Sequence, residues 1–150
     1  MQISMKCSVA VHCLIFIHEA KGKAKVTSQL LAQSTGSSPV VIRGILSALK
    51  KAGIITVTRG IGGAELCKAP SDITLFAIYH ALEPNGLSSL IGIHPCEGRE
   101  CPVAKNIRSV LQRPYQKIED AVRQAMKGIT LESMIADFHD AIENPVTTSE

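Results

Sequence analysis

The stretch from Ser37 to Pro70 constrains the fold of this chain more than any other, because it specifies several elements in a fixed order. Its first part predicts a helix: Ser38 has the side chain of an N-cap, and Pro39 has the fixed φ that suits a first helical position. We expect Gly53 to end this helix. The apolar residues in between recur at helical spacing and are Val41, Ile42, Ile45, Leu46 and Leu49. The segment therefore begins with a capped helix that has an apolar face.

The second part of the stretch predicts a hairpin of two short strands. Ile54–Thr58 is rich in β-branched residues, and Ala64–Cys67 can pair with it across the turn Arg59–Gly63. Glycines fill most of that turn, so its tip is thin, and it carries an arginine. A helix followed by a strand, a glycine tip and a second strand, with basic residues along them, is the order in which a winged helix meets DNA.

A short turn joins this helix to the helix before it. That second helix is predicted to begin at Thr27 or Ser28, to cover Gln29–Gln33 and to stop near Gly36. Ser34–Ser37 then separates the two helices, and so short a glycine-containing turn is typical of a helix-turn-helix. The predicted fold class is mainly α: a winged helix-turn-helix with a two-stranded wing and a long C-terminal helix.

Helices are also predicted on either side of this unit. We expect one over Ser4–Ala20 and another from Asp72 or Thr74 to Leu82, and then a loop over Glu83–Cys101 that is rich in Gly, Pro and Ser. With 45% hydrophobic residues, no tryptophan and 3% aromatics, the core must be aliphatic.

A long helix is predicted from Pro102, and a final short helix ends at about Ala141. Pro114 should kink the long helix or split it in two. Its apolar residues recur about every 3.5 residues and form a seam that consists of Val103, Ile107, Val110, Pro114, Ile118, Ala121 and Ala125. We therefore divide the chain into a DNA-binding domain over residues 1–82, a sensor-type loop over 83–101 and dimerisation helices over 102–143.

The distribution of charge supports this division. Residues 1–66 carry eight Lys or Arg against two Asp or Glu, whereas residues 67–150 carry eight against eleven. A basic N-terminal half suits a polyanion such as DNA. The apolar run Cys7–Ile17 keeps helical spacing and lacks a cleavage site, and no run reaches the ~18 apolar residues of a membrane span. We expect a cytoplasmic protein with no membrane contact, whose five cysteines start reduced.

The start of the helix after Ser38 offers candidate base contacts, because this end of a recognition helix enters the major groove. The candidates are Ser38, Val40, Arg43 and Gly44. Arg43 suits guanine, although a solvated helix charge is an equal alternative. Lys50 either contacts phosphate or stabilises the helix dipole. Arg59 and Gly60, at the hairpin tip, suit a narrow minor groove. The glycines lack the full G-x-G-x-x-G pattern and open no helix, so we reject a nucleotide-binding loop.

Four motifs follow one another along the chain. They are VVIRxIxxxLKKAGI, Arg59-Gly60-x-Gly62-Gly63, Asp72-Ile73-Thr74-Leu75 and Cys101-Pro102-Val103-x-x-Asn106-Ile107. In this order they resemble the Rrf-two (Rrf2) family of bacterial winged-helix regulators, which includes the IscR, NsrR and CymR types. The pattern is most similar to the YwnA-like branch of that family. The resemblance covers roughly Met1–Phe138.

The resemblance implies a homodimer that forms through the long C-terminal helix and binds palindromic promoter DNA, usually as a repressor. It also implies contacts to DNA bases from the positions of Ser38, Val40, Arg43 and Gly44, with a wing arginine at Arg59. Ala64 stands where many members have tyrosine. We expect this difference to alter the packing of the wing and not the fold.

His94, Cys96 and Cys101 gather in the loop before the long helix. Family members that hold an iron–sulfur cluster carry three cysteines in this loop, and some add a histidine three residues after the last. This chain has two cysteines there, and Ala104 occupies the histidine position. Because C-x4-C alone is a weak metal signal, we expect no cofactor. A thiol switch at Cys96 and Cys101 is the first alternative, and zinc or an iron–sulfur cluster is the second.

No set of residues typical of a catalytic site is visible, so we expect no enzyme activity. The predicted function is a sequence-specific DNA-binding transcriptional regulator, a homodimeric repressor on a palindromic operator. The alternative is a redox- or metal-binding protein that uses the winged helix for protein contacts. A small thiol enzyme with Cys101 as its nucleophile is a further alternative.

Overall fold

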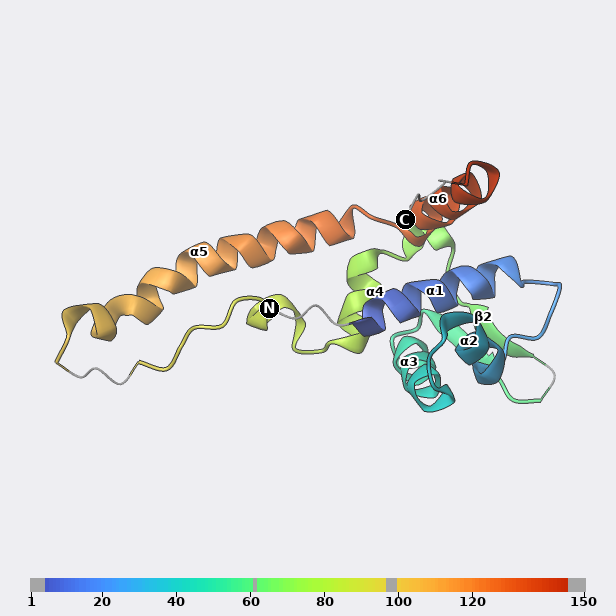
Figure 1. The fold of residues 1–150 in the computed structure, drawn as a ribbon, viewed down its shortest axis with the longest axis horizontal. Helices are drawn as coiled ribbons and strands as arrows, with labels where there is room; N and C mark the ends of the chain where they lie inside the picture. Colours follow the sequence, from blue (N-terminus) through green and yellow to red (C-terminus); the bar gives the residue numbers. More distant parts are fainter. Residues whose placement is uncertain (1–4, 61, 97–99, 146–150) are drawn as a thin grey trace.

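A computed structural model describes residues 5–60, 62–96 and 100–145 of the chain, in which one small hairpin lies beside the N-terminal helices (Figure 1). The elements in chain order are α1 (Met5–Glu19), α2 (Ser28–Thr35), α3 (Pro39–Lys51), β1 (Ile55–Thr58), β2 (Gly63–Leu66), η1 (Pro70–Asp72), α4 (Leu75–Leu82), η2 (Gly86–Ser89), α5 (Pro102–Lys127) and α6 (Leu131–Glu143). This arrangement confirms the predicted mainly α winged helix-turn-helix. Among the described residues, no helix combines the length and apolar character that a bilayer crossing requires.

Polar side chains begin the helices of this unit, as their chemistry predicts. The Ser38 hydroxyl accepts a hydrogen bond from the Val41 N–H at 3.3 Å and starts α3. Thr27 caps α2 in the same way. For α4 the cap is Thr74 and not Asp72, which belongs to η1. Each cap satisfies an N–H group that has no partner within its helix.

The differences from prediction lie at the element ends. β1 begins at Ile55 because the Ile54 N–H donates to the Leu49 carbonyl at 3.0 Å and closes α3. Gly53 precedes it with a φ of 71°, which completes a helix end typical of glycine. α2 ends at Thr35, directly before Gly36, where the sequence predicts its end. Ser4, where the first helix is predicted to begin, lies outside the described residues.

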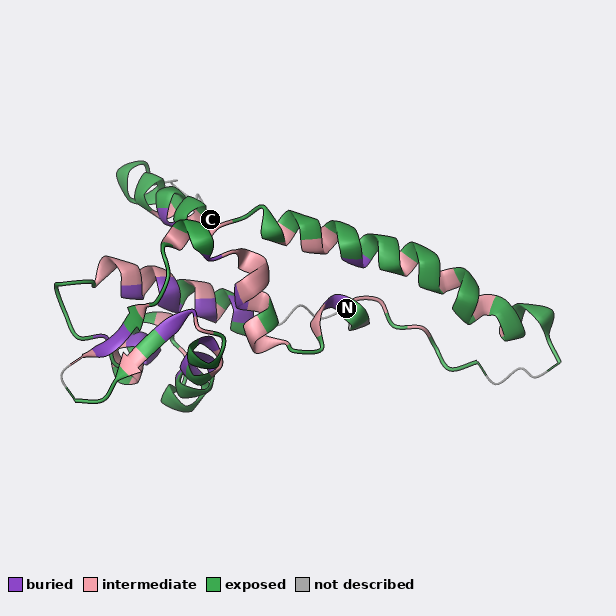
Figure 2. Cartoon of the chain, turned by 180° about the vertical axis from the view of Figure 1, so that it is seen from behind, coloured by how far each residue is buried: buried purple, intermediate pink, exposed green. Residues whose placement is uncertain are grey.

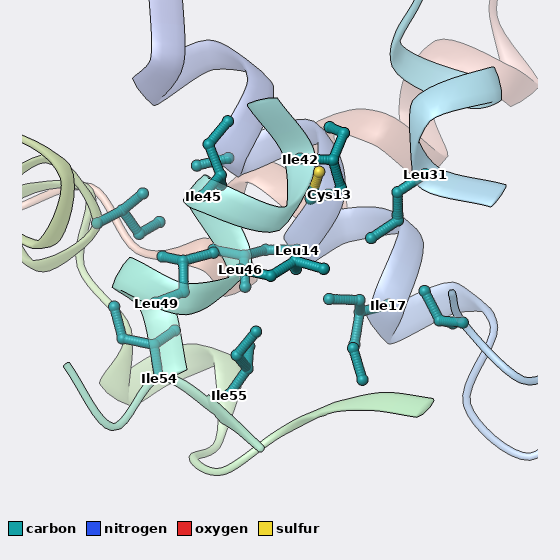
Figure 3. Close-up of a cluster of buried hydrophobic side chains, with 14 of the residues drawn as sticks. Cys13, Leu14, Ile17, Leu31, Ile42, Ile45, Leu46, Leu49, Ile54 and Ile55 are labelled. Atoms are coloured by element: carbon teal, nitrogen blue, oxygen red, sulfur yellow. The ribbon is translucent and has the colours of Figure 1, made fainter. Parts of the chain in front are cut away.

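The core forms around α1, which buries Cys7, Ala10, Cys13, Leu14 and Ile17 and has further apolar residues beside this face. Its buried residues Cys13, Leu14 and Ile17 meet the apolar face of α3, where Ile42 and Leu49 are fully buried (Figure 3). α2, α4, β2 and α6 also pack against α1. Each buried Leu or Ile side chain contributes roughly 1.5–3 kcal/mol. The buried core is aliphatic, as the composition predicts.

The wing is attached to the chain segment that precedes α2. The Ala64 N–H donates to the Val26 carbonyl at 3.0 Å, and Ala64 is itself buried. Gly63 has a φ of +80°, and a Cβ added there would lie 2.8 Å from that same carbonyl oxygen. The contact therefore requires glycine, both for its backbone conformation and for the space beside it.

α5 is a continuous helix of 26 residues, so Pro114 does not split it. Pro114 lacks the N–H that would bond to the carbonyl of Val110. Both residues are exposed, so water can satisfy that carbonyl and the helix can continue. Figure 2 shows α5 exposed or half-exposed along nearly its whole length. Together with the segment that leads to it, α5 forms an arm extending from the other helices (Figure 1).

α6 returns to the N-terminal unit. Thr74 and Thr130 form an isolated bridge, where Leu75 N–H donates to Ile129 O and Leu131 N–H donates to Ile73 O, each at 2.8 Å. Beyond it, buried α6 residues join the core beside α1. At the surface, His139 Nε2 lies 2.7 Å from a carboxylate oxygen of Glu19. These contacts tie the C-terminal helix to the first one.

The glycines of the wing provide a test of this packing. Gly60 also has a positive φ, of +88°, but a Cβ there would meet nothing within 4 Å. We expect Gly60→Ala to cost about 1–2 kcal/mol for the left-handed backbone alone. Gly63→Ala should cost clearly more, because its Cβ also meets the Val26 backbone. Urea unfolding measures the free energy of unfolding of both variants. Equal losses of stability would contradict the close contact between Gly63 and the Val26 backbone.

Candidate nucleic-acid interface

α3 turns its apolar face to the core and leaves the opposite face free. Val40, Arg43, Gly44 and Ser47 follow one another at helical spacing on this outer face, and all four are exposed. Val40 is 69% exposed. The sequence-predicted candidates of α3 therefore share one accessible surface. Ser38 lies at its end as the N-cap.

A groove of about 400 Å³ separates α3 from the wing and from the start of α2. Three cationic side chains line it: Lys25 from the segment before α2, and Arg43 and Lys50 from α3. Its hydroxyl groups come from Thr27, Ser28, Ser47 and Thr58, on α3, the start of α2 and the wing. No acidic residue lines the groove. This lining suits an anion that accepts several hydrogen bonds, such as the phosphates of a DNA strand.

The charge of this groove is not neutralised by the protein. Within the described parts of the chain, the ion pairs are Arg123–Asp120 and His139–Glu19, neither of which involves the groove. Lys25, Arg43 and Lys50 are exposed. Because no carboxylate competes for them, these cations are available to a polyanion.

Arg59 and Gly60 stand apart from the groove, at the tip of the wing. Both are exposed, and Arg59 follows directly after the last residue of β1. The hairpin is narrow here because a Cβ at Gly62 would lie 2.5 Å from Thr58 Cβ. Ile61, between Gly60 and Gly62, lies outside the described residues. The tip therefore presents an arginine on a thin loop, a shape that suits a minor groove.

Sequence reasoning missed part of this interface. Lys25 and Thr27 were not candidates, nor were the hydroxyl residues Ser28, Ser47 and Thr58. Ser47 continues the spacing of Val40, Arg43 and Gly44, and that periodicity alone would have found it. Lys25 and Thr58 reach the groove through the contact of the wing with Val26, which local patterns do not reveal.

The loop before α5 brings two possible metal ligands together. Cys96 Sγ lies 3.7 Å from His94 Nε2, and both residues are exposed. Cys101 precedes the first residue of α5 and makes no side-chain capping bond. In the described residues, no three His, Cys, Asp or Glu side chains converge. Zinc sites and iron–sulfur clusters use four ligands in most proteins, so the described residues do not form such a site.

Comparisons with known proteins agree with this geometry. Residues 3–137 match the model of the Rrf2 family, described as an iron-dependent transcriptional regulator. YwnA of Bacillus subtilis strain 168, whose name places it among HTH-type transcriptional regulators, is 32% identical over 133 residues, or 89% of this chain and 96% of YwnA.

Two solved structures show the same fold. A protein of Lactobacillus plantarum described as a transcriptional regulator superposes with a TM-score of 0.74 and is 31% identical. The match covers 95% of this chain and 93% of that one. IscR of T. potens has a TM-score of 0.70 over the whole of this chain and 93% of its own, at 22% identity. The relatives are transcriptional regulators and not enzymes.

The five cysteines should separate into two reactivity classes. Burial raises the pKa of the Cys7 thiol and raises that of Cys13 to about 11, so few of these thiols ionise at neutral pH. Cys67, Cys96 and Cys101 are exposed. A thiol-specific reagent at neutral pH should label three cysteines in the native protein and all five after unfolding. Rapid labelling of Cys13 in the native state would contradict the packing of α1.

Gly44 offers a second test, because it lies inside α3 and a Cβ added there would meet nothing within 4 Å. Gly44→Ala should raise the free energy of unfolding by about 1 kcal/mol, the difference in helix propensity. Thermal unfolding measures this gain. If DNA approaches the helix backbone here, the same variant binds DNA more weakly although it is more stable. A loss of stability would show that the position is not open.

Proposed function

The chain belongs to the Rrf2 family of transcriptional regulators, and we propose that it represses transcription by occupying a palindromic operator as a homodimer. The observation that carries this proposal is the groove between α3, α2 and the wing. Its cations Lys25, Arg43 and Lys50 face no acidic partner among the described residues. A DNA strand supplies the phosphates that such a groove lacks.

In this arrangement α3 enters the major groove with its outer face. Val40 lies where it can meet a thymine methyl group, and the guanidinium of Arg43 can pair with guanine O6 and N7. Gly44 has no side chain, so the helix backbone can approach the base edges. Ser38, at the N-terminal end of the helix, is a further candidate base contact, and Lys50, at the C-terminal end, lies near a phosphate that borders the groove. The N-terminal half of the helix thereby contacts bases, while Lys50 holds its C-terminal end on the DNA backbone.

The wing supplies a second contact. Arg59 and Gly60 lie at its tip, which is too thin to fill a major groove but narrow enough for a minor groove. The negative potential of a narrow minor groove attracts arginine. Arg43 and Arg59 thus have separate roles, the first in recognising a base pair and the second in recognising groove width.

The homodimer forms through α5 in this proposal. Its predicted seam is exposed in the single chain: Val103 by 68%, Val110 by 61% and Ile118 by 41%. Apolar residues at this spacing are typical of a helix that packs against a second helix. A symmetric pair would set two α3 helices about 34 Å apart, one turn of DNA. Residues 1–82 are then the DNA-binding part and residues 102–143 the assembly part, joined by residues 83–101.

The signal that controls binding depends on that connecting loop. His94 and Cys96 form a pair there, and a metal or cluster would need further ligands that the described residues do not bring to it. The C-x4-C spacing is a weak metal signal, so we propose that Cys96 and Cys101 act as thiols without a cofactor in a cytoplasmic protein. The alternative function, a redox- or metal-binding protein with a wing that contacts proteins, makes no use of the basic groove.

Binding to duplex DNA of mixed sequence tests the groove. Lys25→Ala should weaken binding equally for all sequences and lower the slope of log affinity against log salt by about 0.9. Lys23→Ala is the matched control, since Lys23 is exposed but does not line the groove. Arg43→Ala and Arg59→Ala should instead reduce discrimination among sequences, by about 1–3 kcal/mol at one base pair for Arg43. If the affinity for DNA did not depend on salt concentration and did not change in Arg43→Ala or Arg59→Ala, the DNA-binding function would be contradicted. A redox- or metal-binding protein that uses the wing for protein contacts would then be favoured.

A further inference from the structure

A second pocket lies between α1, the end of α2 and α6, and it shares no lining residue with the DNA-binding groove. We call it the α1–α6 pocket, and its volume is about 600 Å³. Val11, Ile15 and Phe16 line it from α1, and Phe138 lines it from α6, which lies beside α1 (Figure 1). A pocket of this size with mostly apolar walls is typical of small-molecule sites.

Aromatic side chains are concentrated at this pocket. The chain has three phenylalanines and no tryptophan, and two of the three, Phe16 and Phe138, line the α1–α6 pocket. Phe138 is half-buried although it does not pack against the core, and its ring lies 5.6 Å from that of His139. Among the described residues, no aromatic ring contacts Phe16. A further ring that enters the pocket would therefore meet an aromatic side chain from each of two helices.

The polar groups of the pocket are already bonded within the protein. His12 Nε2 lies 2.9 Å from Ser34 Oγ, and a carboxylate oxygen of Glu19 lies 2.7 Å from His139 Nε2. In the described parts of the chain, no lysine or arginine lines the pocket. A ligand carboxylate would therefore find no cation there, and a ligand ammonium group would have to compete with His139 for Glu19. The lining favours an uncharged ligand.

The small extent of the pocket favours a small molecule over a protein partner. Eight residues line it. A stable protein interface has about 20–30 residues on each side, so this pocket alone is too small to hold a partner chain. The apolar seam of α5, on which the proposed homodimer depends, contributes no lining residue. The pocket is therefore separate from the residues assigned to DNA binding and to dimerisation.

We propose that the α1–α6 pocket binds a small uncharged aromatic molecule. The ring of the ligand contacts Phe16 and Phe138, and a hydroxyl group on it exchanges hydrogen bonds with the His12–Ser34 pair. Ser34 lies four residues before Ser38, the N-cap of α3, so the bound ligand is close in the chain to the start of the helix that contacts DNA. An effect of the ligand on DNA affinity rests on the proposed function, whereas its binding does not.

Three probes of similar size test the proposal: benzyl alcohol, cyclohexylmethanol and benzoate. Titration of the full chain, followed by nuclear magnetic resonance, should show benzyl alcohol binding about three- to tenfold more tightly than cyclohexylmethanol, the gain typical of an aromatic pair. Benzoate should not bind. Phe138→Leu should reduce benzyl alcohol to the affinity of cyclohexylmethanol. Phe76→Leu is the matched control, because Phe76 lies on α4, stacks on His80 and does not line the pocket.

The proposal is overturned if the two alcohols bind alike, if benzoate binds as well, if no probe binds, or if the two leucine variants respond equally. Ser8→Tyr is a second variant that does not alter the core: Ser8 is exposed and lines the pocket, so a larger side chain there should fill it and abolish binding. Binding that appears only when the protein is diluted to the monomer would show that a second copy covers the pocket, and would also overturn the proposal. None of these measurements contains DNA, so their outcome is separate from the test of the DNA-binding groove.

Discussion

The burial of α1 is the constraint on which the other elements depend. Its apolar residues cover more than one face, so no single neighbour can cover them, and α2, α3, α4, β2 and α6 all pack against this helix. Leu14 and Cys13 are inaccessible to solvent at the centre of this arrangement. The orientation of the helix-turn-helix and the return of α6 are two consequences of covering the same helix. The charged groups of the DNA-binding surface have no part in this core.

The separation of core and surface explains how so small a unit can present a rigid interface. The inner face of α3 is held by its buried residues, so its outer face keeps a constant orientation. The hydrogen bond from Ala64 to Val26 holds the wing beside the segment that carries Lys25. Three cations therefore surround one groove, and their repulsion is tolerated because each remains in contact with water.

The arm formed by α5, unlike the N-terminal helices, is not stabilised by burial in the core. Its side chains are mostly exposed in one chain, so packing against this chain alone contributes little to its stability. One of its faces carries a feature that a solvated helix does not need, the apolar seam that includes Val110. The bridge between Thr74 and Thr130 links the end of this arm to the start of α4. A displacement of α5 would therefore act directly on α4, which packs against α1.

Local chemistry determined much of this protein from the sequence alone. Ser38 and Pro39 start α3, Gly53 ends it, and the glycines of the wing tip form the turn, because caps and left-handed turns depend on residues within a few positions of one another. Tertiary structure decided the rest: which cations share a groove, that α6 returns to α1, and that Phe16 and Phe138 line the same pocket. Those outcomes arise from contacts between residues far apart in the chain, which no local pattern specifies.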